Sequence, residues 1–232
     1  MSGLLLWDFD GTLAYHTELW SGCLARILSE LGSAGAITSD DVAPHLSAGF
    51  PWHSPEVAHP HLGDPDLWWA ALYPVFQRAA TSLGLHPEHA QRAAERMREE
   101  YPAPHRFCLF SDVLPALDTL HAAGWRHVLL SNHTPELPRI VTALGLDSHL
   151  DGLIGSAATG FEKPHPAMFE QGRRYARPGE PAWMIGDNYS ADIEGAERCG
   201  IPAILVRKDH PVAQRQAPDL ANLHTLLGKN QT

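Results

Sequence analysis

The chain has 232 residues, 44% of them hydrophobic, which is enough to bury one large domain or a core domain that carries an insertion. Its 17 basic and 27 acidic residues give a net charge of −10, which argues against nucleic acid and membranes as partners, because Lys and Arg bind phosphate groups. The three cysteines lie far apart in the sequence, which is typical of free thiols in a reducing compartment. The apolar start lacks a basic segment and is interrupted by Asp8, so we expect a cytoplasmic protein without a signal peptide or membrane span.

The first predicted element is a buried strand, the apolar run 4–7, which ends in two carboxylates. Residues two apart on a strand point to the same face, so Asp8 and Asp10 are expected to lie together where the strand ends. Gly11 and Thr12 then allow a sharp turn. Two carboxylates about 4 Å apart repel by roughly 4 kcal/mol at an effective dielectric near 20. The pair therefore needs a cation, a shared proton or several hydrogen bonds.

Residues 16–108 are predicted to be helical except for one loop. The loop, residues 44–66, is rich in Pro and His, and a loop of this length in a compact domain is usually functional or disordered. Asp64 followed by Pro65 is typical of a helix start, and Pro74 is a candidate kink further along that helix. The predicted helices are 17–31, a short one from Thr38, 64–83 and 87–101.

Strands and helices alternate after Ser111. Short apolar strands that alternate with helices are typical of a parallel sheet covered by helices on both faces. The fold class is therefore predicted as α/β, with a helical insertion after the first strand. The predicted strands of this part are 126–131, 150–154, 182–185 and 203–206, and the predicted helices are 111–124, 134–145, 164–175, 190–199 and one from Asp219.

Polar residues stand where the predicted strands end. Ligands of open parallel sheets bind beyond the carboxyl ends of the strands, so these side chains are expected to share one edge. Converging carboxylates suit Mg²⁺, a lysine offsets further negative charge, and a hydroxyl or an amide can hydrogen-bond a phosphoryl oxygen. The residues are Asp8, Asp10, Ser131, Asn132, Lys163, Asp187 and Asp192.

Four short motifs among these residues resemble those of the haloacid dehalogenase superfamily of hydrolases. They are Asp8-Phe9-Asp10-Gly11-Thr12, Ser131-Asn132, Lys163-Pro164, and Gly186-Asp187 through Asp192, in the family's order. The resemblance implies a Rossmann-like core domain, residues 1–15 and 109–232, and an all-helical C1 cap domain, residues 16–108. One departure is that Tyr15-His16 follows Ala14, where many capped relatives have an acidic residue and then Ser, which leaves the hinge contacts open.

The resemblance also implies a role for each residue. Asp8 would attack phosphorus and form an aspartyl-phosphate, and Asp10 would protonate the leaving oxygen and then deprotonate the attacking water. The Asp8 carboxylate, the Asp10 carbonyl and Asp187 would hold Mg²⁺. The remaining residues would bind the phosphoryl group (Ser131, Asn132 and the catalytic Lys163) or support the site from behind (Thr12 and Asp192).

These residues together predict a Mg²⁺-dependent phosphatase for a small phosphorylated metabolite. Within the resemblance, Asp10 favours phosphate over halide, because dehalogenases lack the second aspartate. Two alternatives are a phosphosugar mutase and a non-catalytic binding or regulatory protein on the same fold. His16 and Trp52 are candidates to line the entrance of the cap, with a packing or surface role as the alternative.

Overall fold

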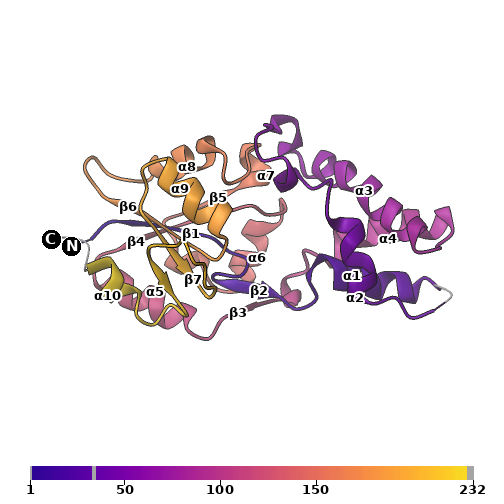
Figure 1. Cartoon of the computed structure of the whole chain (residues 1–232), viewed down its shortest axis with the longest axis horizontal. Coiled ribbons are helices and arrows are strands. Elements are labelled where there is room, and N and C mark those ends of the chain that lie inside the picture. The colour runs from indigo at the N-terminus through magenta and orange to yellow at the C-terminus, as the bar shows by residue number, and fades with distance from the viewer. Residues whose placement is uncertain (1, 33–34, 229–232) are drawn as a thin grey trace.

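The computed structural model describes residues 2–32 and 35–228. Its centre is a six-stranded sheet in which every neighbouring pair is parallel (Figure 1). All four residues of the central strand β1 are buried, as expected for a strand that is covered on both faces. The strand order is β5 (Gly152–Gly155), β4 (Arg126–Ser131), β1 (Leu4–Trp7), β6 (Ala182–Gly186), β7 (Ala203–Val206) and β8 (Gln216–Ala217).

Helices pack on both faces of this sheet, and the alternation along β1 divides them. Leu4 and Leu6 belong to one apolar cluster, together with residues of α8 and α9. Leu5 and Trp7 belong to the second cluster, together with residues of α5 and α6. The predicted α/β fold class is therefore confirmed. The helices of this part are α5 (Val113–Ala122), α6 (Leu137–Ala143), η5 (Asp147–His149), α7 (Ser156–Thr159), α8 (Pro166–Arg173), η6 (Tyr189–Glu194), α9 (Gly195–Arg198) and α10 (Leu223–Gly228).

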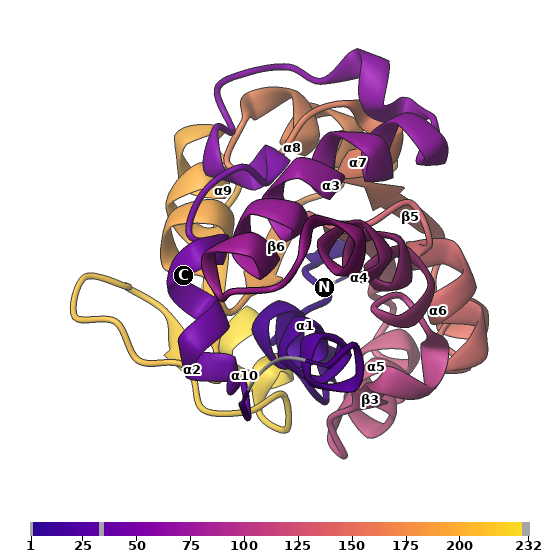
Figure 2. The ribbon, with the colours of Figure 1, turned by 90° about the vertical axis from the view of Figure 1, so that its right-hand side faces the viewer.

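The segment between β2 and β3 forms a separate group of helices beside the sheet (Figure 1), and Figure 2 looks onto this group. Asp64 begins its longest helix: the carboxylate accepts hydrogen bonds from the backbone N–H groups of Asp66 and Leu67. That helix continues through Pro74. The elements are α1 (Leu19–Glu30), α2 (Ser39–Val42), η1 (Ala43–Leu46), η2 (Pro51–His53), η3 (Pro60–Gly63), α3 (Pro65–Ser82), α4 (Pro87–Glu100) and η4 (Pro104–Arg106).

Two short strands join this helical part to the sheet. β2 (Ala14–His16) and β3 (Phe107–Leu109) pair antiparallel, with Ala14 opposite Leu109. The expectation of helix throughout 16–108 outside the loop was therefore wrong at both ends. The strands have three residues each and pair across the whole insertion, so neither carries a recognisable pattern.

Other differences from the predicted elements are local. The loop 44–66 contains three short 3₁₀ turns, and β8 was not predicted. The helix after β6 was predicted from residue 190, but it starts at Tyr189 as a π-helix capped by Asn188, whose Oδ1 accepts from the Ala191 N–H at 3.0 Å. The adjacent residues Trp68 and Trp69 of α3 are both buried. Among the described residues, no helix is both long and apolar enough to cross a membrane.

Candidate active site

The site lies at the carboxyl ends of the central strands, where the parallel topology predicts it. Asp8 follows β1 directly, Ser131 is the last residue of β4, and Asp187 follows β6. The Asp8 N–H donates to the Ile185 carbonyl at 2.9 Å, so the ladder between β1 and β6 continues into the site and fixes the backbone that carries the carboxylate.

Lys163 lies between two buried carboxylates. Its Nζ is 2.7 Å from Asp8 Oδ1 and 2.6 Å from Asp192 Oδ1. The Ser131 hydroxyl donates to the same Asp8 oxygen at 3.0 Å. Burial raises the pKa of Asp192 to about 7, against the opposing effect of Lys163, and the two carboxylates keep the pKa of Lys163 above its ordinary value despite burial. The lysine is therefore the cation that allows both aspartates to be buried.

Asn132 holds the backbone of the Lys163 segment. Its Nδ2 donates to the Lys163 carbonyl at 2.9 Å, and its Oδ1 accepts from the Lys163 N–H at 2.7 Å. Both polar atoms of the side chain are therefore engaged with this segment. Asn132 positions Lys163, and its predicted contact with a phosphoryl oxygen stays a prediction.

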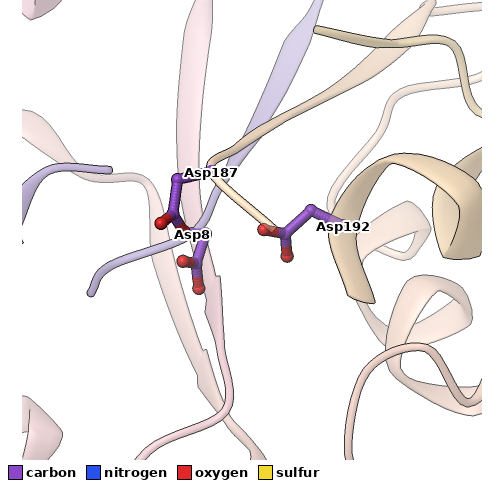
Figure 3. Close-up of side chains that lie close together, drawn as sticks. All are labelled: Asp8, Asp187 and Asp192. Atoms are coloured by element: carbon purple, nitrogen blue, oxygen red, sulfur yellow. The ribbon is translucent and has the colours of Figure 1, made fainter. Parts of the chain in front are cut away.

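Three carboxylates converge at this edge of the sheet. One oxygen each of Asp8, Asp187 and Asp192 lies within 4.8 Å of the others, and all three residues are buried (Figure 3). Burial and the charge of Asp8 raise the pKa of Asp187. Gly11 lies against Asp187 at φ +78°, and a Cβ at this position would collide with the Asp187 carboxylate, so the turn after β1 requires glycine here.

The donor set of this cluster fits Mg²⁺, a hard cation that binds carboxylate oxygens. Asp8 and Asp187 are the members most suited to hold it, because both oxygens of Asp192 are engaged, one by Lys163 and one by the Asn188 N–H at 3.0 Å. The predicted third ligand, the Asp10 carbonyl, stays a prediction. The Asp10 side chain is not part of the cluster.

A second lysine, not predicted from the sequence, also reaches the cluster. Lys208 Nζ lies 2.6 Å from Asp187 Oδ2, although the lysine side chain is 63% exposed. Arg207 fixes the loop that carries it: its Nε donates to the Thr12 carbonyl at 2.7 Å, and its Nη2 pairs with Asp112 at 2.7 Å. The rule used for the other residues would have predicted Lys208 as a site residue, because it follows the carboxyl end of β7. Thr12, expected to support the site, is buried and is linked through this carbonyl to the same loop.

Asp10 lies on the cavity side of the turn and is 41% exposed at its side chain. Desolvation, followed by the charges of Asp8 and Asp187, raises the pKa of Asp10 to about 8. A carboxyl group with this pKa keeps its proton near neutral pH and can act as an acid. His133 Nε2 is 3.5 Å from Asp10 Oδ2, and burial lowers the pKa of His133 to about 4, so the imidazole is neutral beside it.

The carboxylates open into a cavity of about 500 Å³ between the sheet and the helical insertion. The insertion contributes three aromatic rings to its wall: Trp20 of α1, Trp52 of η2 and Tyr101, which follows α4. Trp52 thus lies where it was expected. His16 does not line the cavity but is buried at the start of α1, where its Nδ1 accepts from the Leu19 N–H at 2.8 Å.

Comparison with known proteins identifies the relatives of this chain. The family of haloacid dehalogenase-like hydrolases matches residues 3–200. A phosphoserine phosphatase of Thermus thermophilus is 31% identical, and the alignment covers 94% of each chain. Two solved structures share the fold. Magnesium-bound HAD-hydrolase YfnB of Bacillus subtilis has a TM-score of 0.69 and 18% identity, and the match covers 98% of this chain and 99% of that chain. L-2-haloacid dehalogenase of Xanthobacter autotrophicus has a TM-score of 0.68 and 18% identity, and the match covers 99% of this chain and 100% of that chain.

Proposed function

Because the chain belongs to the haloacid dehalogenase-like hydrolase family, we propose that it is a Mg²⁺-dependent phosphatase that hydrolyses a small phosphorylated metabolite through an aspartyl-phosphate on Asp8. The observation that carries the proposal is the pairing of an oriented carboxylate with an acid. Lys163 and Ser131 hold one oxygen of Asp8 at the cavity, and Asp10, with a raised pKa, lies on the same side. Its relative named phosphoserine phosphatase supports the same chemistry.

In the first step, a carboxylate oxygen of Asp8 forms a bond to phosphorus while the bond from phosphorus to the ester oxygen breaks. The Asp10 proton passes to that oxygen, so the product leaves as a neutral alcohol. In the second step Asp10, now ionised, takes a proton from the water that attacks the aspartyl-phosphate. Asp8 is regenerated and inorganic phosphate is released.

The cations of the site offset the charge that this chemistry brings together. Lys163 faces Asp8 and can also contact a phosphoryl oxygen, while Ser131 keeps the Asp8 carboxylate oriented. Asp8, Asp187 and the Asp10 carbonyl are the groups that we assign to Mg²⁺. When bound, the ion neutralises charge on the phosphoryl oxygens. Lys208 would give up Asp187 to the metal, which its exposed position permits.

We assign residues 16–108 to a cap domain that closes over the cavity and excludes bulk water. The antiparallel pair β2–β3 is the connection about which such a movement would occur. The rings that the insertion adds to the cavity wall are consistent with a role in substrate selection, and the substrate remains a small phosphorylated molecule at this level of the proposal.

The rivals differ in their products. A dehalogenase has the same fold, but a halide needs no proton, and Asp10 with its raised pKa beside Asp8 favours an ester oxygen as leaving group. A mutase would return the phosphoryl group to a sugar and release an isomer. A binding protein would turn over no substrate at all.

The test is release of phosphate from 4-nitrophenyl phosphate, in EDTA and after addition of Mg²⁺. We expect turnover that depends on the metal, and we expect Asp8→Asn to lower it by at least about a thousandfold, as for a removed nucleophile. Asp40→Asn, an exposed aspartate on α2, is the matched control and should match the wild type. Near wild-type turnover by Asp8→Asn would remove the nucleophile assignment, and no turnover of a broad panel of phosphate esters would favour the binding protein.

A further inference from the structure

The position of the leaving group follows from Asp10, so this inference rests on the proposed function. The acid must lie within hydrogen-bond reach of the ester oxygen, and the organic part of the substrate therefore extends from Asp10 into the cavity. Tyr101 and His133 line this part of the cavity with Asp10, and Trp20 and Trp52 continue the wall on the side of the insertion.

The three cap residues form a wall that is ordered by ring stacking. The rings of Trp20 and Tyr101 are stacked, with centroids 3.5 Å apart and planes inclined by 15°. Trp52 is tilted against Trp20 at 5.9 Å and stacked on Phe50 at 4.7 Å. Trp20 and Trp52 are each only half-buried, so part of their surface is left for a ligand. Packing within the insertion thus fixes these rings before any ligand binds.

Charge is confined to the catalytic end of this cavity. Among the described residues that line it, Lys163 is the single lysine, there is no arginine, and the acidic residues are the four site aspartates. Lys163 already bridges Asp8 and Asp192, and the His133 ring nitrogen faces Asp10 at 3.5 Å. A carboxylate on a leaving group packed against the aromatic wall, away from the aspartates and from Lys208 beside them, would therefore be desolvated with no lysine or arginine among the described lining residues to pair with it, which is unfavourable.

The arrangement of the rings also distinguishes an aromatic cage for a cation from an aromatic surface for a flat ring. A cage for a quaternary ammonium group needs ring faces that surround a gap, with the cation within about 6 Å of the ring centroids. Here Trp20 covers a face of Tyr101, so these two rings leave no gap between them for a cation. A wall of this kind suits a second flat ring, because aromatic rings pack in offset-stacked or edge-to-face arrangements.

From this geometry we propose that the substrate is a phosphate monoester whose leaving group carries a planar aromatic ring and neither a carboxylate nor a quaternary ammonium group. The ring packs against Trp52 and Trp20 while the ester oxygen lies at Asp10. The volume of about 500 Å³ accommodates a leaving group of this size. Phosphoserine, the substrate in the name of the 31% identical relative, carries a carboxylate and is a poor substrate on this reasoning.

The test compares kcat/KM, with Mg²⁺, for four probes: benzyl phosphate, cyclohexylmethyl phosphate, O-phospho-L-serine and choline phosphate. Benzyl and cyclohexylmethyl phosphate have similar size and leaving-group basicity and differ in the flat ring. We expect benzyl phosphate to be favoured about fivefold over its saturated analogue, the order of one aromatic contact, and about a hundredfold over the two charged probes. Trp52→Leu should bring the benzyl to cyclohexylmethyl ratio close to one.

Phe76→Leu is the control, because Phe76 stacks on Trp20 but does not line the cavity. Phe76→Leu should lower kcat/KM for benzyl phosphate and for cyclohexylmethyl phosphate by the same factor and leave the ratio of the two values unchanged. A preference for phosphoserine or choline phosphate, or equal turnover of benzyl and cyclohexylmethyl phosphate, would overturn the aromatic assignment and leave the phosphatase in place.

If neither these probes nor 4-nitrophenyl phosphate and the broader panel of esters are hydrolysed, the proposed function fails, and calorimetric binding to Asp8→Asn then tests the aromatic assignment by itself. Benzyl phosphate bound at least tenfold more tightly than phosphoserine and choline phosphate would support it. Equal or undetectable binding would overturn it as well.

Discussion

Replacing Lys163 by Met removes the cation between two buried carboxylates, and the structure sets the size of the effect. Lys163 is 2% exposed, and its Nζ contacts Asp8 and Asp192 at 2.7 and 2.6 Å. Removing one partner of a buried ion pair typically costs about 3–5 kcal/mol, because the other charge stays buried without compensation. We expect Lys163→Met to lose this amount of unfolding free energy at pH 8.5, measured by urea denaturation in EDTA.

The loss should depend on pH in a defined direction. The pKa of Asp192 is raised to about 7 in the folded protein, so the folded state holds more protons than the unfolded chain, and stability falls as pH rises towards that pKa. Without Lys163 the pKa of Asp192 rises further. The stability of the wild type then levels off once Asp192 is ionised, while the variant keeps losing stability up to a higher pH. The deficit should therefore be larger at pH 8.5 than at pH 6.5.

Two further variants make this result decisive. Lys208→Met removes the 63% exposed lysine that pairs with Asp187, and it should cost at most about 1 kcal/mol, with a correspondingly smaller growth of the deficit with pH. The double variant Lys163→Met/Asp192→Asn should recover part of the loss, because it removes one of the two uncompensated charges. A Lys163→Met protein as stable as Lys208→Met, or a deficit that does not change with pH, would refute the reasoning.

Two more predictions concern Asp10 and a histidine outside the site. Asp10→Asn should lower kcat for an alkyl phosphate about 10²–10⁴-fold. 4-Nitrophenyl phosphate needs no proton on its leaving group, so stopped flow with this substrate should show a burst of one equivalent of nitrophenolate before slow turnover. A slow phase without a burst would contradict the two roles of Asp10. His127 is buried, accepts a hydrogen bond from the Trp7 indole at 3.0 Å, and has a pKa lowered to about 4 from 6.5. The unfolded chain therefore binds the proton first as pH falls, which removes about 2 kcal/mol of stability between pH 7 and 5. His127→Gln, which keeps an acceptor for Trp7, should lack this part of the slope in urea unfolding, and an unchanged slope would contradict the assignment.

The sequence predicted the central strands well because burial on both faces leaves a plain signal. The bounds of β4 and β7 were predicted correctly, since each is a short run flanked by turn residues and covered on both faces. β8, two residues at the sheet edge with Gln216 exposed, has no such pattern. β2 and β3 were missed for another reason: each exists only because the other pairs with it across the insertion.

The carboxyl-end rule predicted most of the candidate site for a physical reason. Parallel strands end at one edge, so residues that follow different strands must meet there, as Asp8, Ser131 and Asp187 do. The rule also applies to β7, which is followed by Lys208, but a flexible exposed lysine has no motif that marks it. The spacing of the residues does not predict which partner each side chain binds. Asn132, for example, hydrogen-bonds to the backbone of Lys163.

The aromatic wall was beyond sequence reasoning because it is assembled by tertiary packing. Helical spacing predicts α1 and α4, but not the rotation that brings Trp20 of α1 onto Tyr101 at the end of α4. The same stacking that packs the insertion therefore also forms the surface that we propose for the leaving group. Substitutions at these rings should change stability and specificity together, and only a ratio between two substrates measured on one variant separates the two effects, because lost stability lowers both rates by the same factor.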